Sequence, residues 1–225
     1  MTTIAVVGAG PGLGAAVARR FGREGFDVAL LSRRRERAEG LAADVAADLP
    51  GGGVTVRGFA ADVRDPASLA RALESATETL GPIEVLQYSP APQKDFLRPV
   101  LETTTADMVG PLEVSVHGPI AAVHQVLPGM RFLGRGTVLF VNGGSAARPV
   151  GAVAGTSIAF AGQSAYAQML REAVAGDGVH VAQLIVPGAI SAGHPRKDPA
   201  VLADLLWSMH SGRGEFRTFA EPLDA

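Results

Sequence analysis

Four glycines lie within the short segment 8–14, directly after an apolar run near the start of the chain. The run Ile4–Val7 predicts a buried strand, and the stretch 13–24 predicts the helix that follows. Glycine lets the backbone turn tightly and lets a phosphate approach the main chain. The first turn of the helix offers unpaired N–H groups and a positive dipole end. The segment therefore predicts a phosphate-binding loop whose contacts come from Gly8, Gly10, Pro11, Gly12, Leu13 and Gly14.

A second strand, predicted over 27–32, follows at the spacing of a dinucleotide-binding βαβ unit. It ends at Ser32, and Arg33 and Arg34 come next. In such a unit an acidic residue at this place accepts the ribose 2′-hydroxyl of NAD, whereas arginine accommodates the 2′-phosphate of NADP. No acid is present here, so the sequence favours NADP(H) over NAD(H) as cofactor. In the alternative interpretation, the arginines only solvate the start of a helix predicted over 36–48.

Strands and helices alternate along the rest of the chain, which is typical of a parallel, doubly wound sheet. Further strands are predicted over 54–60, 83–87, 137–141, 179–186 and 215–219. Further helices are predicted over 66–80, 105–127, 156–175 and 199–209, with Asp65 capping the first and a bend near Gly118 in the second. We therefore expect an α/β Rossmann fold of about seven parallel strands with helices on both faces, formed as a single domain over 1–225.

The carboxyl ends of parallel strands meet at one edge of the sheet, where ligands bind in this class of fold. Beyond the glycine loop and the arginines, the segments that follow the later strands are therefore candidates for the same site. One of them, the loop after the fourth strand, makes Ser89 a candidate cofactor contact.

Composition excludes several classes of function. The chain has 225 residues, a formal net charge of −2 and no cysteine, so neither a broad attraction for nucleic acid or anionic membrane nor a thiolate metal site is expected. The histidines show no paired metal-ligand spacing, and no metal is predicted. No apolar run is long enough to span a bilayer, and no secretory leader is recognisable. A cytoplasmic location is expected.

At this point the pattern resembles the short-chain dehydrogenase/reductase family along nearly the whole chain. The glycine motif of that family is matched by Gly8, Gly12 and Gly14, and the Pro187-Gly188 turn corresponds to its turn over the nicotinamide. The resemblance implies that Asp62, with Val63 beside it, bonds the adenine amino group. It implies further that Pro187 and Gly188 close over the nicotinamide and that the backbone near Ile190 bonds the carboxamide. It also implies hydride transfer between a nicotinamide and a carbonyl or alcohol carbon.

The resemblance further implies a tyrosine that moves the proton and a lysine four residues later, and this pair is absent. The chain has two tyrosines, Tyr88 and Tyr166, and neither is followed by lysine at that spacing. Counting from Ser145, which stands at the serine position of the family, places the tyrosine at Ile158 and the lysine at Gly162. A register shifted by one residue gives Ala159 and Gln163. Neither register supplies a proton donor or a cation.

Two residues remain as candidates for catalysis. Ser145 could orient a carbonyl oxygen, and Tyr88, which follows the fourth strand, could handle the proton. Tyr88 could equally be a wall of the pocket with its hydroxyl tied to the backbone. Tyr166 is about 12 Å along the helix from position 158, so it is interpreted as a packing residue.

Two functions therefore remain open. The first is an atypical NADP(H)-dependent oxidoreductase acting on an unidentified organic carbonyl or alcohol. The second is a non-catalytic NADP(H)-binding protein, either a sensor or a partner subunit. The family resemblance places a substrate lid between Ile190 and Pro199, and the shortness of this segment predicts an open or shallow substrate pocket. By resemblance to the family, the helices at 105–127 and 156–175 predict a homodimer or homotetramer.

Overall fold

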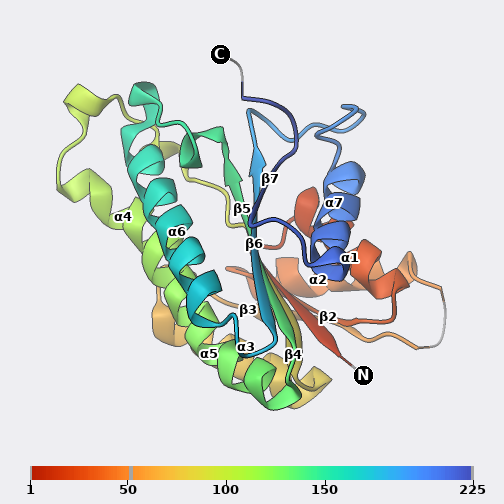
Figure 1. Cartoon of the computed structure of the whole chain (residues 1–225). Helices are drawn as coiled ribbons and strands as arrows, with labels where there is room; N and C mark the ends of the chain where they lie inside the picture. Colours follow the sequence, from red (N-terminus) through yellow and green to blue (C-terminus); the bar gives the residue numbers. More distant parts are fainter. Residues whose placement is uncertain (1, 51–52, 224–225) are drawn as a thin grey trace.

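The sheet has seven strands, all parallel, in the order β3-β2-β1-β4-β5-β6-β7 (Figure 1). This computed structural model describes residues 2–50 and 53–223. The strands are β1 Thr3–Val7, β2 Asp27–Ser32, β3 Val56–Ala60, β4 Ile83–Tyr88, β5 Gly136–Gly143, β6 Val179–Val186 and β7 Arg217–Phe219. Chain order reverses between β1 and β4, and this switch point opens the carboxyl edge to ligands.

Helices cover both faces of the sheet. They are α1 Leu13–Arg23, α2 Arg35–Ala47, α3 Pro66–Leu80, α4 Val109–Leu112, α5 Gly118–Leu133, α6 Ala154–Ala173 and α7 Pro199–Gly212. Short 3₁₀ turns occur at Lys94–Phe96, Val100–Glu102, Ala106–Met108, Gly144–Ala146 and Gly151–Val153. Helices α1, α2 and α7 pack on one face, and α3, α5 and α6 on the other. The expected doubly wound Rossmann fold is confirmed.

Burial explains why these segments form strands. Every residue of β1, β4 and β6 is buried, as expected for strands covered by helices on both faces. Asp65 caps α3, accepting hydrogen bonds from the N–H groups of Ala67 and Ser68, as the sequence predicted. The core therefore consists of two apolar layers, one on each side of the sheet.

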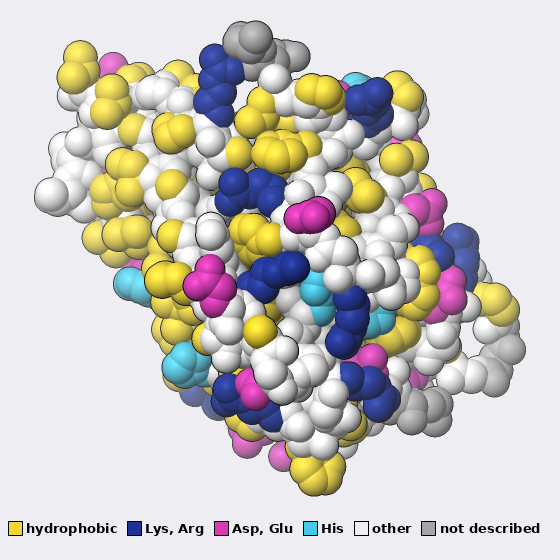
Figure 2. Space-filling model, in the orientation of Figure 1, with side chains coloured by type: hydrophobic (Ala, Val, Ile, Leu, Met, Phe, Trp, Pro, Cys, Tyr) yellow, Lys and Arg dark blue, Asp and Glu magenta, His cyan; other side chains and the backbone are white. Residues whose placement is uncertain are grey.

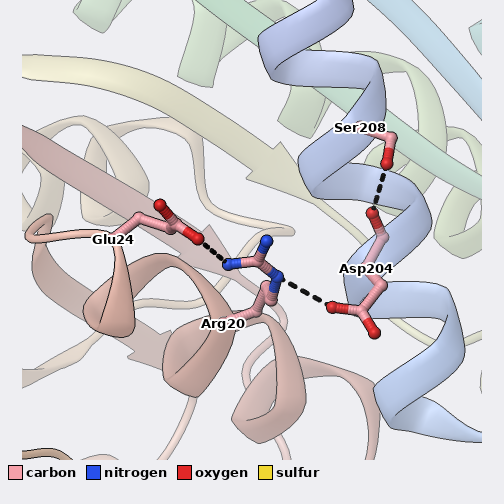
Figure 3. Close-up of polar contacts among 4 residues, drawn as sticks. All are labelled: Arg20, Glu24, Asp204 and Ser208. Atoms are coloured by element: carbon pink, nitrogen blue, oxygen red, sulfur yellow. Dashed lines mark hydrogen bonds and ion pairs between the residues drawn. The ribbon is translucent and has the colours of Figure 1, made fainter.

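Helix α7 docks on α1 through a polar cluster at the surface (Figure 3). Arg20 of α1 donates to Asp204 of α7 at 2.7 Å and also pairs with Glu24 on its own helix. The Ser208 hydroxyl donates to the Asp204 carbonyl at 2.9 Å, and the Arg20 guanidinium lies 4.9 Å from the ring centroid of Trp207. This contact joins the middle of α7 to the C-terminal part of α1.

The predicted helix at 105–127 differs from the structure at both ends. The chain forms α4, a π-helical turn over Glu113–His117 and then α5, which continues to Leu133. The bend expected near Gly118 is this π-helical turn; Pro119 lacks the N–H that would continue the regular ladder. The end expected at residue 127 is wrong, because α5 tolerates Pro128 and ends where Gly134 adopts a left-handed conformation (φ 64°).

Candidate functional site

A cavity of about 750 Å³ lies at the carboxyl edge, beside the switch point. The glycine loop, the ends of β2 and β3, the loop after β4 and the first turns of α2 line it. It brings together many of the residues predicted to contact the cofactor, namely Gly8, Gly10, Pro11, Ser32, Arg33, Arg34, Asp62 and Val63. Residues from four separate strand ends therefore meet at one site.

The glycines of the loop have two different structural roles. Gly8 has a φ of 86°, and a Cβ there would lie 2.6 Å from the backbone nitrogen of Pro90. A Cβ on Gly14 would lie 2.9 Å from the Ala9 Cα. A Cβ on Gly10 or Gly12 would meet no atom within 4 Å, so the backbone is open there. Helix α1 begins at Leu13 without a side-chain cap. The open backbone at Gly10 and Gly12, together with this helix start, forms a cradle suited to a diphosphate.

Arginines gather where α2 begins. Arg33 and Arg34 follow β2, and Arg37 from the first turn of α2 lines the same cavity. Arg34 is the N-cap of α2 but makes no side-chain cap hydrogen bond. Several guanidinium groups at the positive end of a helix are unfavourable by themselves and become favourable beside an anion. Sequence reasoning did not single out Arg37, because it lies within the helix predicted over 36–48 and not directly after the strand.

Asp62 is held in place at the end of β3. One oxygen of its carboxylate accepts the N–H of Arg64 at 3.0 Å, and its own N–H donates to the Ser68 hydroxyl at 3.3 Å. The side chain lies on the wall of the cavity beside Val63. A fixed carboxylate there can accept a hydrogen bond from an amino group, as the sequence resemblance implied for adenine.

Tyr88 is buried in the core with its hydroxyl bonded to the backbone. It is the last residue of β4, is only 1% exposed, and its side chain belongs to the core under α3 and α5. Its hydroxyl donates to the Val114 carbonyl at 2.5 Å, and burial raises the pKa of Tyr88 far above its usual range. The catalytic role considered for Tyr88 does not match this geometry. The alternative, a hydroxyl tied to backbone, describes it.

Ser145 lies in the 3₁₀ turn that follows β5, half-buried and next to α6. On α6, the Ile158 side chain is 52% exposed, and Gly162 lies against Val116 of the π-helical turn. Neither position carries a group that can donate a proton.

The remaining predicted contacts lie along the same edge outside this cavity. Leu13 is buried as the first residue of α1, and the N–H of Ser89 donates to the Val7 carbonyl at 3.0 Å. Pro187, Gly188 and Ile190 follow β6, where Gly188 has a φ of 70°. These residues extend the edge from the cavity towards Ser145.

A chain of polar side chains connects β7 to the end of β5 beneath α6. Arg217 donates to the Gln183 amide oxygen at 2.9 Å, and Gln183 donates to the Asn142 oxygen at 2.9 Å. Asn142 then donates to the Gln163 oxygen at 2.6 Å. Because a guanidinium can only donate, Arg217 fixes the direction of all three amides. Sequence reasoning missed this network, since its members come from four distant elements.

Neither a metal site nor a membrane span is found in the part of the chain that the structure describes. Within residues 2–50 and 53–223, no group of three or more histidine, cysteine or acidic side chains could hold a metal ion. The helices of that part of the chain are all too short or too polar to cross a bilayer.

Comparison with known proteins identifies the family. The family model for short chain dehydrogenases matches residues 2–200. The chain belongs to the short-chain dehydrogenase family. It is 34% identical over 193 residues to 2-(S)-hydroxypropyl-CoM dehydrogenase 3 of Xanthobacter autotrophicus, a match that covers 84% of this chain and 71% of that protein. Several other curated relatives are matched over a little more than half of their length.

Solved structures of the family have the same fold. A short-chain dehydrogenase from Rhodopseudomonas palustris is 26% identical, with a TM-score of 0.83 and 99% of each chain covered. A metagenomic short-chain oxidoreductase in complex with NADP is 21% identical, with a TM-score of 0.80, and the match covers 97% of this chain and 93% of that one. The similarity to this NADP complex supports the fold of the chain. The bound NADP is an observation on that other protein.

Proposed function

We propose that this family member binds NADP(H) in the cavity at the switch point and acts as an oxidoreductase on an organic carbonyl or alcohol. The observation that carries the proposal is the meeting of two anion sites in one cavity. The open cradle at Gly10 suits the diphosphate, and the arginines at the uncapped start of α2 suit a phosphate on the adenosine ribose. The NADP bound by a structural neighbour supports the choice of cofactor.

The residues of the chain suggest a mechanism without a tyrosine–lysine pair for proton transfer. When bound, NADP(H) supplies or accepts the hydride. The Ser145 hydroxyl donates a hydrogen bond to the substrate oxygen and holds it beside the Pro187-Gly188 turn. A bound water gives the proton when a carbonyl is reduced and accepts it when an alcohol is oxidised, because Tyr88 is tied to Val114 and position 158 carries isoleucine. General acid–base catalysis raises a reaction rate about 10²–10⁴-fold. Its loss therefore leaves a slow reaction, which the correct orientation of substrate and cofactor still accelerates.

A non-catalytic NADP(H)-binding protein is the second candidate. The exposed Ile158 and the glycine at position 162 favour it, because the α6 face beside Ser145 then offers an apolar wall instead of an acid and a cation. In that case binding of the nucleotide is itself the function, with the chain as a sensor or a partner subunit.

Both candidates are consistent with a homodimer or homotetramer formed through α5 and α6. Hydrophobic side chains gather over α4 and α6 on the left of Figure 2. Met169 of α6 is 62% exposed, and Ala161 and Ala165 on the same helix are exposed small residues that permit close helix contact. Light scattering at micromolar concentration tests this, and a monomer would refute it.

The experiment that tests the function follows NADPH oxidation by absorbance while a panel of carbonyl compounds is offered. We expect slow turnover of at least one compound. Ser145→Ala is expected to lower that turnover by about 10²-fold, the usual effect of removing a preorganised donor, while NADPH affinity stays the same. NADPH binding without any turnover would select the non-catalytic function, and absence of binding would refute both.

A further inference from the structure

The segment after β7 reaches the candidate site. The N–H of Ala220 donates to the Ile185 carbonyl at 2.9 Å, so this segment, Ala220–Leu223, continues alongside β6 after β7 has ended. A Cβ on Gly144 would lie 3.3 Å from the Leu223 side chain and 3.5 Å from Pro187. Gly144 precedes Ser145. This segment, dark blue in Figure 1, therefore lies at the upper edge of the sheet with the turns that follow β5 and β6.

One ion pair ties this segment to the loop after β6. The Lys197 ammonium lies 2.5 Å from the Glu221 carboxylate, and the two side chains are only 14% and 24% exposed. A Cβ on Gly188 would lie 3.5 Å from the same ammonium, so Lys197 rests against the Pro187-Gly188 turn. A shielded pair is screened less by salt than an exposed one and holds its partners more firmly. The hydrogen bond from Lys197 lowers the pKa of Glu221, which keeps the carboxylate charged.

The loop between Gly188 and α7 is stabilised by hydrogen bonds among its own residues. Two of these bonds involve Lys197, so a contact that fixes Lys197 also restrains the loop. The N–H of Ser191 donates to the Lys197 carbonyl at 3.1 Å, and the Asp198 carboxylate accepts the N–H groups of Gly193 and Ala200 at 2.6 and 2.8 Å. The His194 ring nitrogen Nδ1 accepts the N–H of Lys197 at 3.1 Å. These hydrogen bonds connect Lys197 to the rest of the loop.

We propose that Ala220–Leu223 is a strap, and that Lys197 and Glu221 are positioning residues that hold the Pro187-Gly188 turn in register with Ser145. The strap acts on the nicotinamide half of the cofactor and leaves the adenosine half untouched. This inference rests on the proposed binding of NADP(H). It assigns a role in cofactor binding to a segment that is far in sequence from every predicted contact.

The test compares two ligands by calorimetry: NADPH, and adenosine 2′,5′-bisphosphate, which has only the adenosine half. Glu221→Gln and Lys197→Met are each expected to weaken NADPH binding about tenfold. The affinity for the bisphosphate should change by less than about twofold. The charge-swapped variant Lys197→Glu with Glu221→Lys is expected to restore NADPH binding, because the pair re-forms with opposite polarity. Asp48→Asn, which breaks the remote Arg19–Asp48 pair (2.6 Å), is the matched control and should change neither ligand.

The two hypotheses fail in different ways. If the wild-type protein binds neither ligand, the proposed function is refuted and the strap loses its role. If the wild type binds both and the two single variants leave NADPH unchanged, or weaken both ligands equally, only the strap is refuted. Failure of the charge-swapped variant to recover NADPH affinity also refutes it, because a loss from altered packing alone is not repaired by exchanging charges.

Discussion

Two alanine substitutions in the glycine loop should separate stability from cofactor binding: Gly8→Ala should lower stability, and Gly10→Ala should lower NADPH affinity at unchanged stability. In Gly8→Ala, the new Cβ lies 2.6 and 2.7 Å from the backbone nitrogen and Cα of Pro90, at a φ of 86°. The left-handed conformation costs about 1–2 kcal/mol for alanine. Relief of the clash by backbone movement costs about 1–3 kcal/mol more. The free energy of unfolding should therefore fall by about 2–5 kcal/mol, which lowers Tm by roughly 5–15 °C in a chain of this size.

In Gly10→Ala, the new Cβ meets no protein atom within 4 Å, and the backbone is not left-handed. Stability should stay within about 0.5 kcal/mol of the wild type. The methyl group fills the space where a diphosphate approaches the main chain, so NADPH affinity should fall by about tenfold or more. Thermal melts and NADPH titrations on both variants provide the assay. A Gly10→Ala protein that melts lower but binds NADPH normally would refute this division of roles.

Two further predictions concern buried groups. The pKa of His180 falls from 6.5 to about 4, mainly because the ring is buried and to a smaller extent because Arg171 is positively charged. The folded protein therefore keeps this ring neutral. The unfolded chain takes up the proton first, and stability should fall by about 2–3 kcal/mol as pH drops from about 6.5 to 4. Urea midpoints across this range test it, and an equally steep decline in His180→Gln would contradict it. Tyr88→Phe should lower unfolding free energy by about 1–3 kcal/mol, because the Val114 carbonyl loses its donor, with NADPH affinity unchanged. A change in affinity would contradict the packing role.

The sequence was informative where the site is local. The glycine loop and the arginines after β2 could be placed because each follows a strand directly, and the carboxyl ends of parallel strands meet at one edge. Side-chain direction at a strand end was harder to predict. Strand β4 extends to Tyr88, and the alternation of the pleat then directs this ring into the core under α5.

Contacts between distant segments could not be predicted from the sequence. The amide chain from Arg217 to Gln163 and the Lys197–Glu221 pair each depend on the three-dimensional course of β7 and the segment after it. No local pattern marks Glu221 as a partner of Lys197. Helix α5 likewise passes through Pro128, although local propensity predicts an end there.

The central claim is that the arginines at the start of α2 make this cavity a site for a 2′-phosphorylated dinucleotide. Calorimetric titration of the wild-type protein with NADPH and with NADH tests it most directly, repeated on Arg33→Ala. A charged hydrogen bond contributes about 1.5–3 kcal/mol, and solvent exposure of Arg33 places it at the low end of that range. We predict that NADPH binds more tightly than NADH, and that Arg33→Ala weakens NADPH about tenfold while NADH is unchanged. Equal affinities for the two nucleotides, or an equal loss of both in the variant, would contradict the account.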